Sequence, residues 1–148
     1  MPPIFDAFDY VPALGASGGT VIIWKSCYFS ATRFFQNEFC LSLQFCSNFN
    51  NDSWILSNIY APCTAPGKRD FLNWFKNIQM PDYVNWLLVG DFNLYRSPDD
   101  RNKPGGDHLE MYLFNEAISA LGLVELPLKG RRFTWSNKQL YPLLERLD

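Results

Sequence analysis

Asp91 and Asn93 are the residues whose types and spacing most directly suggest chemistry. They follow the apolar run Trp86-Leu-Leu-Val-Gly90, which is typical of a buried central strand. Residues two apart in an extended segment point to the same side, and ligands bind at the carboxyl ends of strands in layered α/β proteins. An aspartate there can take a proton from water or bind a hard cation, and an asparagine beside it can orient that base or donate to a phosphate oxygen. A simple turn is the alternative, because both residue types favour turns.

Three other motifs accompany this loop. Asn58-Ile-Tyr-Ala-Pro62 ends an expected strand, Phe133-Thr-Trp-Ser-Asn137 lies near the end of the chain, and Arg146-Leu-Asp148 closes it. A motif as short as Gly-Asp-Phe-Asn recurs by chance, but four motifs in a fixed order are more specific. We therefore favour a functional site over a turn.

The composition indicates one compact domain. The 148 residues are 47% hydrophobic and 19% charged, which excludes disorder. The net charge of −2 gives no support to nucleic-acid binding, which usually goes with a basic chain, although a local basic patch is sufficient to hold a few phosphates.

Cysteine usage and the amino terminus suggest an intracellular protein, nuclear or cytoplasmic. The irregular spacing of the four cysteines favours reduced, mostly buried thiols over a zinc site. The only histidine, His108, is expected to be exposed. The chain has no apolar run of membrane-spanning length, and residues 1–9 do not resemble a signal peptide.

The first half of the chain predicts an antiparallel meander. Residues 1–19 are expected to be irregular and to end in a flexible loop, Gly15 to Gly19. Asp6 and Asp9 have no strand context there. Alternating or β-branched runs predict strands, with a hairpin turn at residues 48–52. These strands cover residues 20–25, 28–35, 39–46 and 53–60.

The second half predicts two helices around the strand at residues 86–90. The first opens at Pro66-Gly67, ends at Pro81, and places Phe71, Trp74, Phe75 and Ile78 on one apolar face. The second follows a polar loop at residues 95–106. We expect Asp107 as its N-cap, Glu110 completing a capping box and Gly122 at its C-terminus. Its expected inner side consists of Leu109, Tyr112, Leu113, Ala117, Ile118 and Leu121. Short strands follow at residues 123–126, 133–135 and 143–144.

The ordered motifs N-x-Y-A-P, G-D-F-N, F-T-W-S-N and R-L-D resemble the endonuclease/exonuclease/phosphatase superfamily. The stretch from Tyr95 to Gly106, with Leu-Lys-Gly-Arg-Arg before the third motif, is most similar to the endonuclease domain of plant non-LTR (LINE-type) retrotransposons. The resemblance runs from Gly18 onward. It implies an α+β fold, with residues 1–148 forming a single, incomplete two-sheet α/β sandwich that lacks its first and last strands.

The resemblance also implies Mg²⁺-dependent hydrolysis of a DNA phosphodiester. Asp91 matches the base that activates water, Asn93 the residue that holds the water and the phosphate, and Tyr60 a phenol on the scissile phosphate. Thr134 matches a supporting hydroxyl, and Asp148 the aspartate that orients the catalytic histidine. Asn58, Arg131 and Arg132 are candidate substrate-binding residues. Asp91 and Asn93 are the only candidate metal ligands.

The chain departs from the family pattern at both ends. Residues 1–15 contain neither the family's first Asn nor its metal-binding Glu, and the Ser-Asp-His strand with the catalytic histidine would follow Asp148. His108 does not match that histidine. The resemblance thus implies a chain truncated at both ends, with weak or no activity alone and marginal stability.

Three functions remain open from the sequence. The first is a retrotransposon-derived DNA endonuclease fragment. The second is a non-catalytic remnant that binds nucleic acid or a partner protein. The third is a phosphatase on small phosphate esters, because a fold does not fix its substrate. The loop Lys129-Gly-Arg-Arg132 and a second basic rim of Arg96, Arg101 and Lys103 favour DNA over small esters. Ordinary solvated turns are the alternative for both basic segments. Trp135 is the aromatic residue most suited to base stacking.

Overall fold

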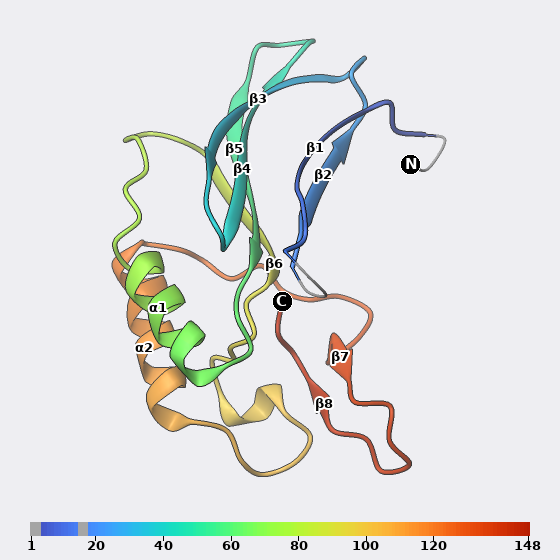
Figure 1. Ribbon diagram of the computed structural model, residues 1–148. Coiled ribbons are helices and arrows are strands. Elements are labelled where there is room, and N and C mark those ends of the chain that lie inside the picture. The colour runs from blue at the N-terminus through green and yellow to red at the C-terminus, as the bar shows by residue number, and fades with distance from the viewer. Residues whose placement is uncertain (1–3, 15–17) are drawn as a thin grey trace. The chain divides into compact units, whose positions relative to one another are not determined.

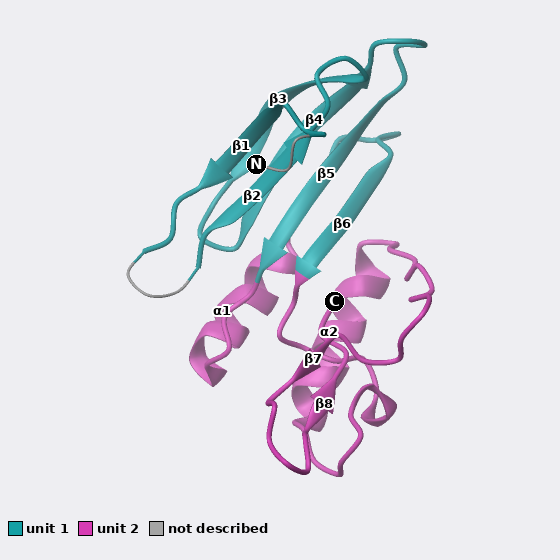
Figure 2. Ribbon diagram, turned by 90° about the vertical axis from the view of Figure 1, so that its right-hand side faces the viewer, with its two compact units in different colours: residues 1–60, 80–90 teal, residues 61–79, 91–148 magenta. Residues whose placement is uncertain are grey.

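The computed structural model describes residues 4–14 and 18–148 and confirms a mixed α+β fold. The chain divides into two compact units (Figure 2). Unit 1 consists of Met1–Tyr60 and Met80–Gly90, and unit 2 of Ala61–Gln79 and Asp91–Asp148. Part of the predicted loop at residues 15–19 lies outside the described residues. No helix in the described part of the chain is long and apolar enough to cross a membrane.

The main sheet of unit 1 confirms the predicted meander for the strands at residues 28–35, 39–46 and 53–60, but the predicted strand at residues 20–25 is not part of this sheet (Figure 1). Its strands, in spatial order, are β3 (Phe29–Gln36), β4 (Cys40–Ser47), β5 (Ser53–Tyr60) and β6 (Trp86–Asp91). The first three are antiparallel, and residues 48–52 turn between β4 and β5 with Asn51 at φ +58°. Figure 2 shows β6 running parallel to β5. The prediction that both faces of β6 are covered is wrong, because Leu87 and Val89 are exposed.

A second, two-stranded sheet precedes the meander. β1 (Ala7–Val11) pairs antiparallel with β2 (Thr20–Trp24). The prediction that residues 1–19 are irregular is therefore wrong for β1, and Asp9 does lie in a strand. The reason is that Phe8, Tyr10 and Val11 have high β propensity. Phe8 and Tyr10 lie on one face of β1, and Val11 lies on the other. The Asp9 carboxylate accepts hydrogen bonds from the Arg33 guanidinium of β3, which links the two sheets.

The core of unit 1 lies between these two sheets. It consists of Leu41, Leu43 and Phe45 of β4 with Ile22 of β2, and Trp54 stacks on Phe45 with ring centroids 5.6 Å apart. The other face of β4 is also buried: the Ser42 and Ser57 hydroxyls are 2.6 Å apart, and Trp86 Nε1 donates to Ser57 Oγ at 2.8 Å. Apolar packing on one face and satisfied polar groups on the other therefore fix this sheet.

The cysteines of the chain are all free, as predicted, but they are not mostly buried. Cys40 is buried in β4 and Cys46 is partly buried, whereas Cys27 and Cys63 are exposed. Both exposed cysteines lie in turns outside the strands and helices, where no core is available to cover them.

Unit 2 contains both predicted helices. α1 (Ala65–Phe75) starts after Thr64, whose hydroxyl accepts from Gly67 N–H, but it ends at Phe75 rather than at Pro81, so Ile78 lies beyond it. α2 (His108–Ala120) starts after Asp107. The Asp107 carboxylate accepts hydrogen bonds from Leu109 N–H and Glu110 N–H, which confirms the predicted N-cap. The Glu110 carboxylate does not complete a capping box, because it forms an ion pair with Lys68 at 3.0 Å.

The buried face of α2 differs from the prediction. Met111, Phe114 and Ala117 are buried, whereas Leu109, Tyr112 and Leu113 are exposed. Phe114 packs on Phe75 and Phe92, with ring centroids 6.1 and 5.6 Å apart. Packing against this aromatic cluster determines which face of α2 is buried, because α2 has apolar residues on several sides. Gly122 follows the helix at φ +64°, as its predicted C-terminal position requires.

The last segments of unit 2 are mostly irregular. Residues 123–126 form no strand, which corrects the prediction, and their apolar side chains are largely exposed. The polar loop contains a 3₁₀ turn, η1 (Pro98–Asp100), with a capping box between Ser97 and Asp100. β7 (Trp135–Ser136) pairs antiparallel with β8 (Leu144–Glu145), close to the predicted positions.

Candidate active site

Gly90 makes the abrupt end of β6 possible. Its φ of +126° lies in the left-handed region that disfavours other residues, and a Cβ at this position would lie only 2.0 Å from the Ile59 carbonyl oxygen. The close approach of β5 and β6 therefore requires glycine at this position.

Asp91 and Asn93 form a tight polar turn directly after this glycine. The Asn93 backbone N–H donates to Asp91 Oδ1 at 2.9 Å, and Asn93 Nδ2 donates to the Ala61 carbonyl at 2.6 Å. Asn93 adopts φ +50°, a conformation that asparagine tolerates better than most residues. Both side chains are partly buried. The turn fixes the Asp91 carboxylate. In the Asn93 side chain, Nδ2 is used within the turn and Oδ1 is the acceptor atom.

Leu147 connects this turn to two distant predicted residues. Its carbonyl accepts from Phe92 N–H at 2.9 Å, and its N–H donates to Thr134 Oγ1 at 3.1 Å. Leu147 itself is buried. These two hydrogen bonds place Thr134 and the exposed Asp148 beside the Asp91 turn, although the three residues come from separate parts of the sequence.

The electrostatics of Asp91 suit a base. Burial raises the pKa of its carboxyl above the ordinary aspartate range, and the nearby Asp148 carboxylate raises it further, while the hydrogen bond from Asn93 N–H opposes both effects. A carboxylate with a raised pKa binds a proton more readily, which is what a group that takes a proton from water needs.

Asn58 and Tyr60 belong to unit 1. Tyr60 is the last residue of β5, its backbone N–H donates to the Phe39 carbonyl at 2.9 Å, and its side chain is exposed. The Asn58 amide donates to the Val21 carbonyl at 3.2 Å. Asn58 therefore supports the contact between β5 and β2, a role that its sequence context did not predict.

An open groove of about 620 Å³ contains the predicted substrate-binding residues of unit 2. It is lined by Arg131, Arg132, Phe133, Thr134, Trp135, Ser136, Lys138 and Leu144. Lys138 was missed in the sequence. Its signal was the turn-forming Asn137 before it, which indicates a tight reversal, and Lys138 adopts φ +57° there.

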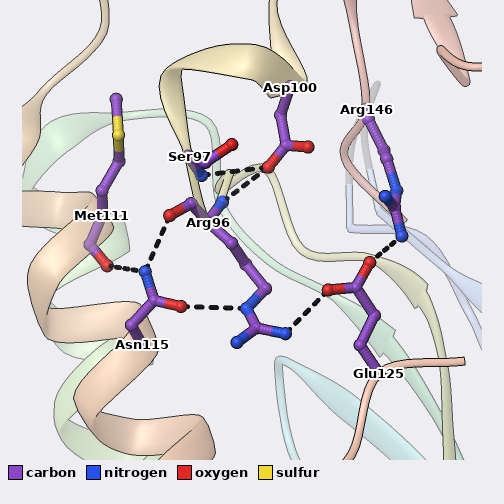
Figure 3. Close-up of polar contacts among 7 residues, drawn as sticks. All are labelled: Arg96, Ser97, Asp100, Met111, Asn115, Glu125 and Arg146. Atoms are coloured by element: carbon purple, nitrogen blue, oxygen red, sulfur yellow. Dashed lines mark hydrogen bonds and ion pairs between the residues drawn. The ribbon is translucent and has the colours of Figure 1, made fainter.

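The cations of the second predicted basic rim all have partners within the protein, which favours the alternative of an ordinary loop there. Arg96 donates to Asn115 Oδ1 at 2.9 Å and to Glu125 Oε2 at 2.7 Å, and Glu125 also pairs with Arg146 (Figure 3). Two N–H groups of the Arg96 guanidinium are therefore bonded within the protein.

The other two cations of this rim also have partners. Arg101 Nε lies 2.8 Å from Glu145 Oε1 without the alignment of a hydrogen bond, so this contact is an ion pair. Lys103 Nζ donates to the Tyr141 carbonyl. Like Arg96, they hold the polar loop to neighbouring segments.

The donor set for a metal is small. Among the described residues, no group of three or more His, Cys, Asp or Glu side chains is placed to hold an ion. Asp91 and Asn93 offer a carboxylate and an amide oxygen, which suit Mg²⁺ only as an ion that keeps most of its waters. His108 is exposed, as predicted, and is the first residue of α2.

Comparison of the sequence with models of protein families, and with curated proteins, finds no match. The residues of the chain and their geometry are therefore the basis for any functional assignment.

Proposed function

We propose that this chain is an endonuclease/exonuclease/phosphatase-type domain, derived from a non-LTR retrotransposon endonuclease and related to enzymes that cleave DNA phosphodiesters. The observation that supports this most is the pair of Leu147 hydrogen bonds, which bring Thr134 and Asp148 beside the Asp91 turn. The proposed role of each of these residues requires them to lie near one another.

In the proposed reaction, Asp91 takes a proton from the water that attacks phosphorus, the bond from phosphorus to the leaving oxygen breaks, and that oxygen takes a proton from solvent water. The hydrogen bond from Asn93 N–H orients the carboxylate, and the raised pKa makes it a stronger base. Asn93 contacts a phosphate oxygen, whose negative charge grows in the transition state and is stabilised by such a donor. Thr134 fixes the backbone of Leu147 and thereby the position of Asp148.

Asp91 and Asn93 are the residues that would hold Mg²⁺, with water as the other ligands. The ion would supply positive charge for the phosphate oxygens. A site with two protein ligands is expected to be weak.

The second candidate is a non-catalytic relative that binds nucleic acid or a partner protein. The position of His108 favours it: the chain's only histidine lies at the exposed start of α2 and does not match the family's catalytic histidine.

Plasmid nicking separates these two candidates. Supercoiled plasmid is incubated with the full chain and Mg²⁺, next to Asp91→Ala and to Asp82→Ala, an exposed carboxylate in the turn before β6. We expect weak nicking by the wild type and by Asp82→Ala, in line with the low activity that the resemblance implies, and a rate lower by about 100-fold or more for Asp91→Ala. Equal rates in all three proteins would leave only the non-catalytic function.

A further inference from the structure

The groove of unit 2 combines positive charge with an exposed aromatic ring. Three of its eight lining residues are cations, Arg131, Arg132 and Lys138, and none is acidic. The whole chain has a net charge of −2, so this groove is a local exception on an acidic molecule. A groove lined by charges of one sign concentrates the electric field and attracts anions to that place.

Local contacts hold the Arg132 side chain and the backbone of Lys138 in place. The Arg132 guanidinium lies 5.3 Å from the centre of the Phe133 ring, and its Nη2 donates to the Asp99 carbonyl at 3.3 Å. An arginine has five N–H donors, so most of them remain for a ligand. Lys138 extends from a left-handed turn that is closed by its own N–H bond to Ser136 Oγ at 3.1 Å.

Trp135 supplies an exposed aromatic surface in the same groove. It is 43% exposed, although it forms a strand pair with Glu145. The backbone of β7 is thus fixed while the indole is accessible. A fixed aromatic ring beside cations is the combination that binds unpaired nucleotides, because the bases stack and the phosphates pair with the cations.

We propose that this groove binds single-stranded nucleic acid, with a base stacked on Trp135 and phosphates on Arg131, Arg132 and Lys138. A duplex fits less well, because the faces of its bases are already stacked on their neighbours. The inference deepens the proposed function and rests on it for the class of substrate. Thr134 lines the groove and also binds Leu147 N–H, so a strand in the groove lies next to the Asp91 turn.

Binding is measured by fluorescence anisotropy in EDTA, where metal-dependent cleavage cannot occur. The probes are labelled oligothymidylate and oligouridylate of about ten nucleotides, and a duplex of the same length. We expect either single strand to bind at least about tenfold more tightly than the duplex. The tighter of the two strands identifies whether DNA or RNA occupies the groove, and a preference for the duplex would overturn the proposal.

Variants assign the binding to the groove. We expect Trp135→Ala to weaken single-strand binding by about tenfold or more, and Trp135→Phe to retain most of it. Arg131→Ala with Arg132→Ala should reduce the salt dependence of log K by about 0.7 for each lost phosphate contact. Tyr112→Ala and Arg69→Ala are matched controls, because both residues are exposed in unit 2 outside the groove.

Unchanged binding in Trp135→Ala and in the double arginine variant would refute the groove, as would an equal loss in the controls. The arginine variant changes only exposed side chains, so it keeps the test valid if Trp135→Ala unfolds. Plasmid nicking without oligonucleotide binding would contradict the groove alone, and oligonucleotide binding without nicking would contradict only the proposed catalysis.

Discussion

The Asp91 carboxylate is partly buried and therefore loses part of its hydration. Burial and the neighbouring Asp148 both raise its pKa, and only the Asn93 N–H bond stabilises the charged form. This environment makes the charged form of the carboxyl less favourable than it is for an aspartate in water. Residues in functional sites often lower stability in this way, because their arrangement serves a ligand.

Replacing Asp91 with Asn should therefore stabilise the protein near neutral pH. A raised folded-state pKa means that the contribution of Asp91 to stability is fully present below its unfolded pKa of about 3.9 and is lost as the pH rises through its folded pKa. Asp91→Asn removes this loss, and its amide oxygen can still accept from Asn93 N–H. We expect a higher midpoint of thermal unfolding at pH 7, and a gain that shrinks as the pH falls below about 4.

Thermal unfolding followed by circular dichroism from acid to neutral pH tests this expectation. Asp82→Asn serves as the control, because Asp82 is exposed in a turn. A gain in unfolding midpoint that is the same at every pH, or a loss of stability at pH 7, would show that the charged form of Asp91 does not destabilise the folded protein.

Asn93 offers a second test, of the turn itself. Asn93→Ala removes the amide bond to the Ala61 carbonyl and leaves a residue that tolerates φ +50° poorly. Asn93→Gly removes the same bond but adopts this φ freely. We expect urea unfolding to show a loss of about 1–2 kcal/mol for Asn93→Ala, and Asn93→Gly to be more stable than Asn93→Ala by about 1 kcal/mol. Equal stability of the two variants would argue against strain at this position.

At the scale of elements, two glutamates form ion pairs with arginines and connect the region of β8 to other segments of unit 2. Glu145 pairs with Arg101, and both side chains are only 14% exposed. Glu125 pairs with Arg96 and Arg146, but its own side chain is 39% exposed. Removing one partner of a buried pair leaves an uncompensated charge, whereas exposed pairs contribute little.

Glu145→Gln should thus destabilise unit 2 more than Glu125→Gln, although Glu125 has two arginine partners. We expect a loss of about 2–4 kcal/mol for Glu145→Gln and at most about 1 kcal/mol for Glu125→Gln. Urea unfolding of the two variants measures this order. The reverse order would mean that the arginine bridge of Glu125, not the buried pair, secures this region.

The elements also show what local sequence can predict. The strands from Thr20 to Tyr60 were predicted because their alternation and β-branched residues are local signals. The same signal is present in β1, but it covers only five residues between irregular segments. The buried face of α2 could not be read in this way, because Leu109 and Phe114 both continue apolar rows, and the aromatic packing of Phe92 decides between them.

The candidate site has the same division between local and long-range information. Asp91 and Asn93 were predictable from the end of an apolar strand, whereas the close approach to β5 that requires Gly90 is visible only in the structure. The hydrogen bonds of Leu147 join residues that are far apart in the chain, and no spacing rule predicts them. Only the resemblance to a known family indicated that Thr134 and Asp148 belong with Asp91.

At the scale of the whole molecule, the exposed surface of the two-stranded sheet should govern solubility. Phe8, Tyr10 and Val21 lie on its outer face and are each more than half exposed. Within the described residues, β1 and β2 pair as strands only with each other, so each keeps an edge without a neighbouring strand. Apolar surface beside a free strand edge favours association with other chains.

Val21→Lys should therefore reduce self-association, because a charge on this face opposes its burial against another molecule. Leu140→Lys is the matched control: it adds the same charge at a residue that is 89% exposed in unit 2, far from the sheet in sequence. We expect sedimentation velocity to show concentration-dependent association of the wild type and of Leu140→Lys, and a larger monomer fraction for Val21→Lys. A wild type that stays monomeric at high concentration would contradict this expectation. An equal effect of the two lysines would instead show that net charge, rather than the face of β1 and β2, controls association.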